Sequence, residues 1–146
     1  MQFSDEIEIA APRDKVWAFL LDPESVGTCA PGVESVNVID DRHFQAIVKV
    51  GIGQFRSRFT VDLEMADLTP PSYAAVRARG SAPGTAVDAV AHMSLEDSGE
   101  HGTRMEWQAD VTVSGKLAAV GSRLIEWTAN KLIGQTFDCI KARLEA

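Results

Sequence analysis

The chain has 146 residues, of which 45% are hydrophobic and 24% charged, and this is enough for one globular domain (residues 1–146) with a sizeable core. The formal net charge of −7, with no basic stripe, argues against nucleic acid as a partner and opposes adsorption to an anionic membrane. No apolar run reaches the roughly 20 residues that span a bilayer, and the N-terminus lacks a secretory signal pattern, so we expect a cytoplasmic location.

The N-terminal part is expected to form one strand and two short helices. Residues 2–10 alternate between apolar and polar side chains, which is typical of an edge strand. Pro12 stands where proline can open a helix, and Asp22-Pro23 ends that helix. Pro23 can begin a second short helix, which ends before Pro31-Gly32.

Six further strands are expected between residues 33 and 115. The clearest pattern follows the turn at 51–53, where apolar side chains alternate strictly with polar ones. Such alternation indicates an antiparallel sheet with one buried face and one solvated face. The apolar members of this strand are Phe55, Phe59, Val61, Leu63 and Met65.

The last segment has the period of a helix, which we expect to run from about residue 116 to Leu144. A helix of this length would measure about 43 Å, and it must cover the sheet to bury its apolar side. The predicted inward stripe is Leu117, Val120, Leu124, Thr128, Leu132, Gln135 and Cys139. The predicted fold is therefore α+β: a curved antiparallel sheet of about seven strands around a long C-terminal helix, with two short helices after the first strand.

Small residues on two neighbouring strands leave two interpretations open for the interior. Ala74, Val76, Ala78 and Gly80 share one face with Ala89 and Ala91 of the next strand, beside bulky side chains. Such a surface can line a pocket for an apolar guest, or it can let the helix approach closely and leave no space. The predicted lining residues are Phe59, Val76, Ala78, Ala89, Ala91, Met93, Met105, Trp107, Leu124, Trp127 and Thr128.

The residues that could support catalysis or hold a metal are scattered. His101 lies in the turn at 98–102 and His43 opens a strand, both in solvent. His92 shares a strand face with Asp88, as an exposed pair or as a base oriented by a carboxylate. Cys29 and Cys139 form no zinc spacing and no disulfide framework, so we expect buried, unreactive thiols. We predict no catalytic residue, no metal site and no cofactor.

Two surface features have alternative interpretations. Trp127, at the border of the helical stripe, could cap a pocket or contact a partner. Four arginines on the polar side of the sheet either form a basic patch for an acidic partner or pair with carboxylates across strands. These arginines are Arg56, Arg58, Arg77 and Arg79, and the carboxylates are Asp62 and Glu64.

Several short motifs, in this order and spacing, resemble the family of the carbon monoxide dehydrogenase G subunit (CoxG), a branch of the START-like superfamily that includes polyketide cyclases. The resemblance covers nearly the whole chain. It is carried by Ala11-Pro12, Val16-Trp17, Asp22-Pro23-Glu24, Cys29-Ala30-Pro31-Gly32-Val33, the turn at 49–53, Pro71-Ser72-Tyr73 and the segment 114–125.

The resemblance implies a helix-grip fold with a hydrophobic cavity between sheet and helix, which favours the pocket over the closed interior. It implies a non-catalytic carrier of a lipid or quinone-like molecule, and association with a molybdenum hydroxylase of the carbon monoxide dehydrogenase type. The alternatives are a polyketide cyclase-like enzyme and an assembly partner with a filled core. Relatives that reach membranes do so through a tail after the domain, and this chain stops at Ala146, which argues against membrane attachment by that route.

Overall fold

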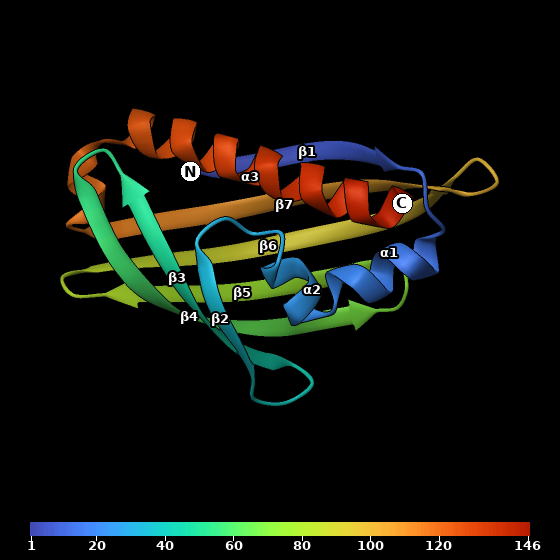
Figure 1. Cartoon of the computed structure of the whole chain (residues 1–146), viewed down its shortest axis with the longest axis horizontal. Helices are drawn as coiled ribbons and strands as arrows, with labels where there is room; N and C mark the ends of the chain where they lie inside the picture. The colour runs from blue at the N-terminus through green and yellow to red at the C-terminus, as the bar shows by residue number, and fades with distance from the viewer.

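A computed structural model describes all 146 residues and consists of one seven-stranded sheet with its helices on one side (Figure 1). The order of elements agrees with the sequence prediction. They are β1 (Gln2–Ile9), α1 (Arg13–Leu20), α2 (Pro23–Gly27), β2 (Val33–Val38), β3 (His43–Ile52), β4 (Phe55–Thr69), β5 (Tyr73–Ala82), β6 (Thr85–Ser98), β7 (Gly102–Gly115), the 3₁₀ helix η1 (Leu117–Val120) and α3 (Ser122–Glu145).

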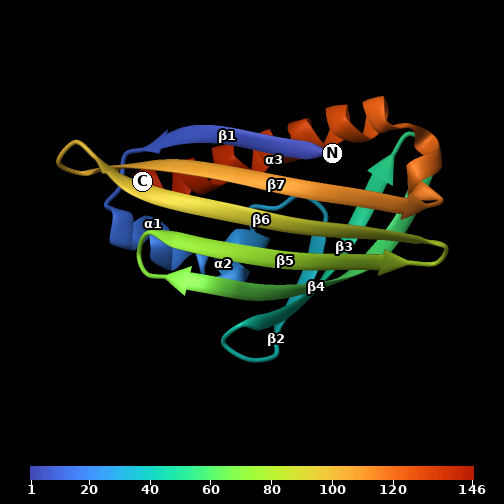
Figure 2. The ribbon, with the colours of Figure 1, turned by 180° about the vertical axis from the view of Figure 1, so that it is seen from behind.

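The sheet is antiparallel throughout, in the order β1-β7-β6-β5-β4-β3-β2. Successive hairpins connect β2 to β7, and β7 pairs with β1 on its other side. The two edge strands of the sheet, β1 and β2, are therefore neighbours in the sequence. Seen from behind, the long strands form one uncovered face, and all helices lie beyond them (Figure 2). The predicted helix-grip arrangement is confirmed.

The C-terminal helix differs from the prediction in length and, in part, in the face it turns inward. Gly121, with φ of 98°, separates η1 from a helix of 24 residues, because this backbone conformation cannot continue an α-helix. Ile125, Ile140 and Leu144 are buried in α3, whereas Leu124 and Gln135 are exposed. Leu117 and Leu132 of the predicted stripe do face the interior and Cys139 forms a disulfide, so the stripe is confirmed in part, and Ile125 and Ile140 are buried beside it.

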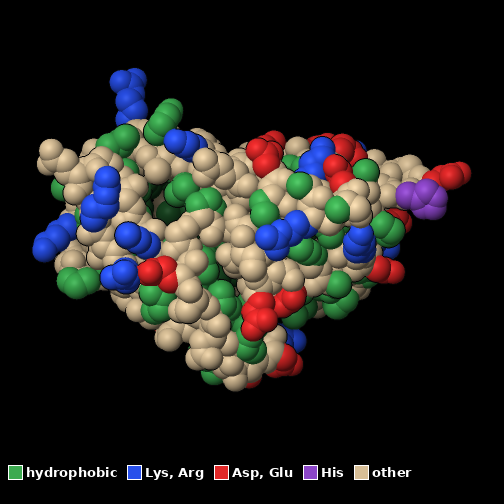
Figure 3. Space-filling model, viewed as in Figure 1, with side chains coloured by type: hydrophobic (Ala, Val, Ile, Leu, Met, Phe, Trp, Pro, Cys, Tyr) green, Lys and Arg blue, Asp and Glu red, His purple; other side chains and the backbone are tan.

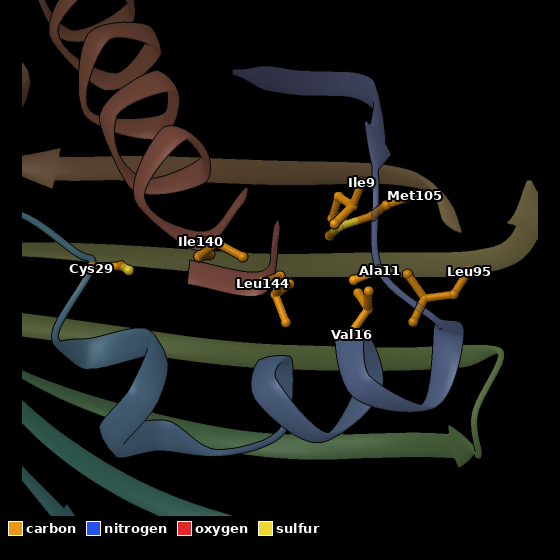
Figure 4. Close-up of a cluster of buried hydrophobic side chains, with 8 residues drawn as sticks. All are labelled: Ile9, Ala11, Val16, Cys29, Leu95, Met105, Ile140 and Leu144. Atoms are coloured by element: carbon orange, nitrogen blue, oxygen red, sulfur yellow. The ribbon is translucent and has the colours of Figure 1, made fainter. Parts of the chain in front are cut away.

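The larger core cluster lies where α1 and the end of α3 meet the sheet. It consists of Ile9, Ala11, Val16, Cys29, Leu95, Met105, Ile140 and Leu144 (Figure 4). These side chains come from both ends of the sequence, so the cluster joins β1 and α1 to the C-terminal helix. Hydrophobic burial here anchors only one end of α3.

Replacing Ile140 with alanine should destabilise the domain by about 2–5 kcal/mol, since the side chain is only 2% exposed and its removal leaves a cavity. Urea unfolding of the two proteins measures the difference. The exposed Val38→Ala, at 49% exposure, serves as the control, and a similar loss in both variants would contradict this account of the core.

The prediction of two free thiols is wrong, because Cys29 and Cys139 form a disulfide with their Cα atoms 5.4 Å apart. The bond connects the segment after α2 with α3, across 110 residues of sequence. Arg143 of α3 also donates a hydrogen bond to the Thr28 hydroxyl, next to the disulfide. Such a long separation carries no spacing signal, and only the fold brings the two residues together.

Candidate ligand-binding site

Two adjoining apolar hollows lie between the sheet and the helices. The first hollow, of about 330 Å³, is bounded by α2, β2 and the strands β3 to β5. Twelve of its 14 lining residues are hydrophobic, so it offers almost no polar group to a guest. They are Leu20, Pro23, Val26, Gly27, Ala30, Val33, Val36, Phe44, Ala46, Val48, Val61, Leu63, Met65 and Val76.

The second hollow, of about 240 Å³, lies under η1 and the first half of α3. It shares Val48 and Val61 with the first hollow, so the two are neighbouring compartments of one interior. Fourteen of its 15 lining residues are hydrophobic. They are Val48, Val50, Ile52, Phe59, Val61, Ala78, Gly80, Val87, Ala89, Val111, Val113, Leu117, Ile125, Ala129 and Leu132.

The second hollow exists because small residues occupy the centre of the sheet. Ala78 of β5 pairs with Ala89 of β6, and Gly80 follows on the same face. A β-carbon at Gly80 would lie 3.3 Å from the ring of Phe59 and 3.5 Å from the side chain of Val61, so a larger residue would intrude on the space. The space-filling view shows a depression bordered by hydrophobic side chains (Figure 3).

The structure brings four of the predicted lining residues to the hollows. Phe59, Ala78 and Ala89 line the second hollow, and Val76 lines the first. The remaining seven are not among the residues lining either hollow. They are Ala91, Met93, Met105, Trp107, Leu124, Trp127 and Thr128.

Ala91 pairs with Val76 of β5, and the other six have surroundings away from the hollows. Met105 is buried in the core cluster, with Met93 and Trp107 packed against it. Leu124 and Trp127 are 37% and 63% exposed, and the Thr128 hydroxyl donates to the Leu124 carbonyl at 2.9 Å.

Sequence reasoning missed most of the first hollow, which is lined largely by α2, β2 and β3. A signal was present in the strict alternation of Phe44, Ala46 and Val48, but the short apolar residues of α2 have no periodic pattern. Their contribution depends on the tertiary position of α2.

Comparison with known proteins identifies the family. The family model of the carbon monoxide dehydrogenase G subunit (CoxG) matches residues 6–145. The chain belongs to the CoxG family. No functionally curated protein matches it significantly.

Solved structures share the fold of this CoxG domain. A conserved protein from Geobacillus kaustophilus is 24% identical, with a TM-score of 0.91 over 99% of this chain and 95% of that one. A START superfamily protein from Mycobacterium smegmatis has 13% identity and a TM-score of 0.74, over 99% and 97% of the chains. The ZhuI aromatase/cyclase from Streptomyces sp. R1128 has 15% identity and a TM-score of 0.75, over 99% and 93%.

The histidines of the CoxG domain lie outside both apolar hollows. His92 hydrogen-bonds the Tyr73 hydroxyl at 2.7 Å, whereas Asp88 accepts a hydrogen bond from Arg79 at 2.8 Å. The predicted pairing of His92 with Asp88 is therefore wrong, because each finds a closer partner on β5. No group of three or more potential metal-ligating side chains is found.

The arginines of the outer sheet face are only partly paired. Arg58 binds Glu34 at 2.6 Å, so its partner comes from β2 and not from Asp62 or Glu64. Asp62 instead accepts a hydrogen bond from Gln45 at 3.0 Å. The outer face therefore carries separate ion pairs, without a continuous basic patch along β4 and β5.

The imidazole of His43 lies between two carboxylates. Its hydrogen bond with Asp40 (Nδ1–Oδ1, 2.8 Å) raises the pKa of His43, and Glu64, 3.4 Å from Nε2, contributes in the same direction. Both imidazole nitrogens face carboxylates on the exposed surface. The His43–Asp40 pair therefore stabilises the connection between β2 and β3, and it lies outside the two hollows.

Folding raises the pKa of His43 above its ordinary value of 6.5. The ion pair of His43 with Asp40 should therefore stabilise the domain fully at pH values below 6.5, and this stabilisation should disappear as the pH rises through the higher pKa of the folded state. Asp40→Asn keeps an acceptor for the backbone but removes the charge. We expect it to lower the His43 pKa in an NMR titration and to destabilise the domain at pH 5 but not at pH 9. An unchanged His43 titration would contradict the assignment.

The indole of Trp107 lies between the sheet and α3. Its Nε1 is buried without a hydrogen-bond partner, and its ring stacks on Phe137 with centroids 5.6 Å apart. Trp107 thus packs between the sheet and α3 beside the core cluster.

Proposed function

We propose that this CoxG family protein is a non-catalytic carrier that holds an apolar small molecule, of lipid or quinone-like character, in the two adjoining hollows. The fold is one that binds hydrophobic small molecules, which supports this role. The observation that carries the proposal is the composition of the lining, which is hydrophobic at all but two positions in the first hollow and all but one in the second.

Binding would be driven by removing apolar surface from water, worth about 25 cal/mol per Å². The size of the first hollow lies at the lower end of the range typical of small-molecule sites, about 300–1,000 Å³, and the second extends it. The shared residues Val48 and Val61 would let an elongated guest occupy both compartments.

The same lining is the reason we propose a carrier instead of a cyclase-like enzyme. General acid–base chemistry requires polar groups within hydrogen-bond reach of the reacting atoms. Neither hollow is lined by a charged residue or a histidine. The unfilled volume likewise supports a carrier over an assembly partner with a closed interior.

Family membership supports a second element of the proposal, an accessory role for a molybdenum hydroxylase of the carbon monoxide dehydrogenase type.

A cytoplasmic location is the accompanying expectation, and the disulfide weighs against it, because such bonds persist mainly in oxidising compartments. Alkylating free thiols in intact cells before lysis tests the location: labelled Cys29 and Cys139 support the cytoplasm, and unlabelled cysteines contradict it.

The carrier proposal is tested by titrating the purified protein, after organic extraction and refolding, with a fluorescent apolar probe. We expect saturable binding of about one probe per chain, with competition by a long-chain isoprenoid quinone or a fatty acid. Absence of saturable binding by a correctly refolded protein would overturn the proposal.

A further inference from the structure

One wall of the first hollow is a short segment that the rest of the domain holds at few points. We call this segment, residues 22–32, the α2 flap; it runs from the end of α1 through α2 to the start of β2. No residue of α2 is buried. The flap contributes Pro23, Val26, Gly27 and Ala30 to the lining. A movement of the flap would therefore open the hollow to solvent.

The side-chain hydrogen bonds of the flap are mostly internal. The Ser25 hydroxyl donates to the Asp22 carboxylate at 2.6 Å, and the Thr28 hydroxyl donates to the Ser25 carbonyl at 2.7 Å. One side-chain hydrogen bond connects the flap with another element, from Arg143 of α3 to the Thr28 hydroxyl. No ion pair involves a residue of the flap. Polar contacts alone therefore hold the flap weakly.

The disulfide ties the middle of the flap to the opposite side of the domain. The flap continues directly from α1 at its start, and near its end the Lys49 amide of β3 donates to the Gly32 carbonyl at 2.7 Å. Between these two ends lies Cys29, which is bonded to Cys139 of α3 (Figure 4). The chain has two cysteines, so this is the one covalent bond between the flap and α3.

The two cysteines differ in how far solvent reaches them. Cys29 is 6% exposed and belongs to the core cluster. Cys139 is half-buried on α3 and follows the exposed Asp138. A thiolate from solution can therefore approach the disulfide from the side of Cys139.

We propose that the disulfide is a redox switch for the first hollow: reduction by a dithiol frees the α2 flap, so that an apolar guest can enter and leave, and reoxidation holds the flap closed. A thiolate of the dithiol attacks the sulfur of Cys139, the S–S bond breaks, and Cys29 leaves as a thiolate that takes up a proton. The second thiol of the dithiol then attacks the mixed disulfide and releases Cys139 as a thiol. Two electrons and two protons pass to the protein, and the dithiol becomes a disulfide.

The position of the bond favours local opening over unfolding of the domain. The core contacts of Ile9, Val16 and Leu95 join β1, α1 and β6 and do not depend on the flap. Segments with few buried contacts open at a lower free energy than the core does. The entry and release of a guest rest on the proposed carrier function, whereas the freeing of the flap does not.

Exchange of parinaric acid, an elongated fluorescent polyene fatty acid, tests the switch. Stopped-flow mixing of the free protein with the probe gives the entry rate, and mixing of the loaded protein with excess cyclodextrin gives the release rate. After reduction with dithiothreitol we expect both rates to rise by about tenfold or more, a small part of the constraint that a disulfide across a long loop imposes. The dissociation constant should change much less, because an open flap speeds entry and release alike.

Two variants serve as controls for the chemistry. C29S/C139S should exchange the probe at the fast rate with or without dithiothreitol. Arg143→Ala removes the hydrogen bond to Thr28 and keeps the disulfide, so its oxidised form should exchange the probe at the slow rate of the oxidised unchanged protein. Equal exchange rates for the oxidised and reduced unchanged protein would overturn the switch while leaving the carrier intact.

Hydrogen–deuterium exchange of the protein without a guest separates a freed flap from a weakened fold. On reduction we expect faster amide exchange that is confined to the flap and its borders. Equally faster exchange throughout the chain would show that the bond only stabilises the fold, and this would overturn the switch. Absence of saturable parinaric acid binding by the oxidised protein would refute the carrier, and the exchange pattern would still decide whether reduction frees the flap.

Discussion

Removing the disulfide in the double variant C29S/C139S is expected to lower the free energy of unfolding by about 4–5 kcal/mol. The bond closes a loop of 110 residues, and its loss frees the unfolded chain to occupy many more conformations. For a domain of this size we expect the melting temperature to fall by about 10–20 °C. Differential scanning calorimetry at fixed protein concentration measures the change.

A reducing agent provides the matched control for this variant. Dithiothreitol should lower the melting temperature of the unchanged protein to that of C29S/C139S and should not affect the variant. Equal melting temperatures for the oxidised protein and the variant would contradict a stabilising disulfide.

The disulfide also bears on the first hollow. Cys29 precedes Ala30, which lines that hollow, and its partner Cys139 is held by α3. Without the bond, the segment after α2 would be retained mainly by the Arg143–Thr28 hydrogen bond and by packing against β2. We therefore expect faster amide exchange at residues 27–33 in C29S/C139S than in the oxidised protein.

Filling the second hollow with Ala89→Phe should weaken binding of an apolar probe by at least about 100-fold, because the ring would occupy the space that a guest needs and the lost contacts are worth several kcal/mol. Ala89 faces the hollow from the centre of β6, where its register partner is Ala78. Probe titration with the unchanged protein and the variant measures the loss.

The neighbouring Val90→Phe is the matched control, since Val90 lies on the outer face of the same strand and is 39% exposed. It should bind the probe normally and melt near the unchanged protein. Equal probe affinity for Ala89→Phe and the unchanged protein would place the guest elsewhere.

The fold was predictable because its elements carry strong local patterns. The alternation from Phe55 to Met65 identifies β4 as an antiparallel strand, and Pro12 and Pro23 mark the beginnings of the two short helices. Short turns between the strands then require neighbouring strands to pair. The position of β1 beside β7 completes this arrangement.

The details of the site were less predictable, since they depend on tertiary position. The Cys29–Cys139 bond joins residues with no sequence relationship. Leu124 and Ile125 are adjacent apolar residues of α3, and the packing of the helix on the sheet buries Ile125 and leaves Leu124 exposed. The role of α2 in closing the first hollow likewise depends on where the helix packs.

Native mass spectrometry of the gently purified protein tests most directly whether the hollows hold an apolar guest. We predict a population heavier than the 15.8 kDa chain by the mass of one small molecule, released on denaturation and recovered in organic solvent. Detection of the bare chain alone, from a protein that also fails to bind apolar probes, would contradict the account.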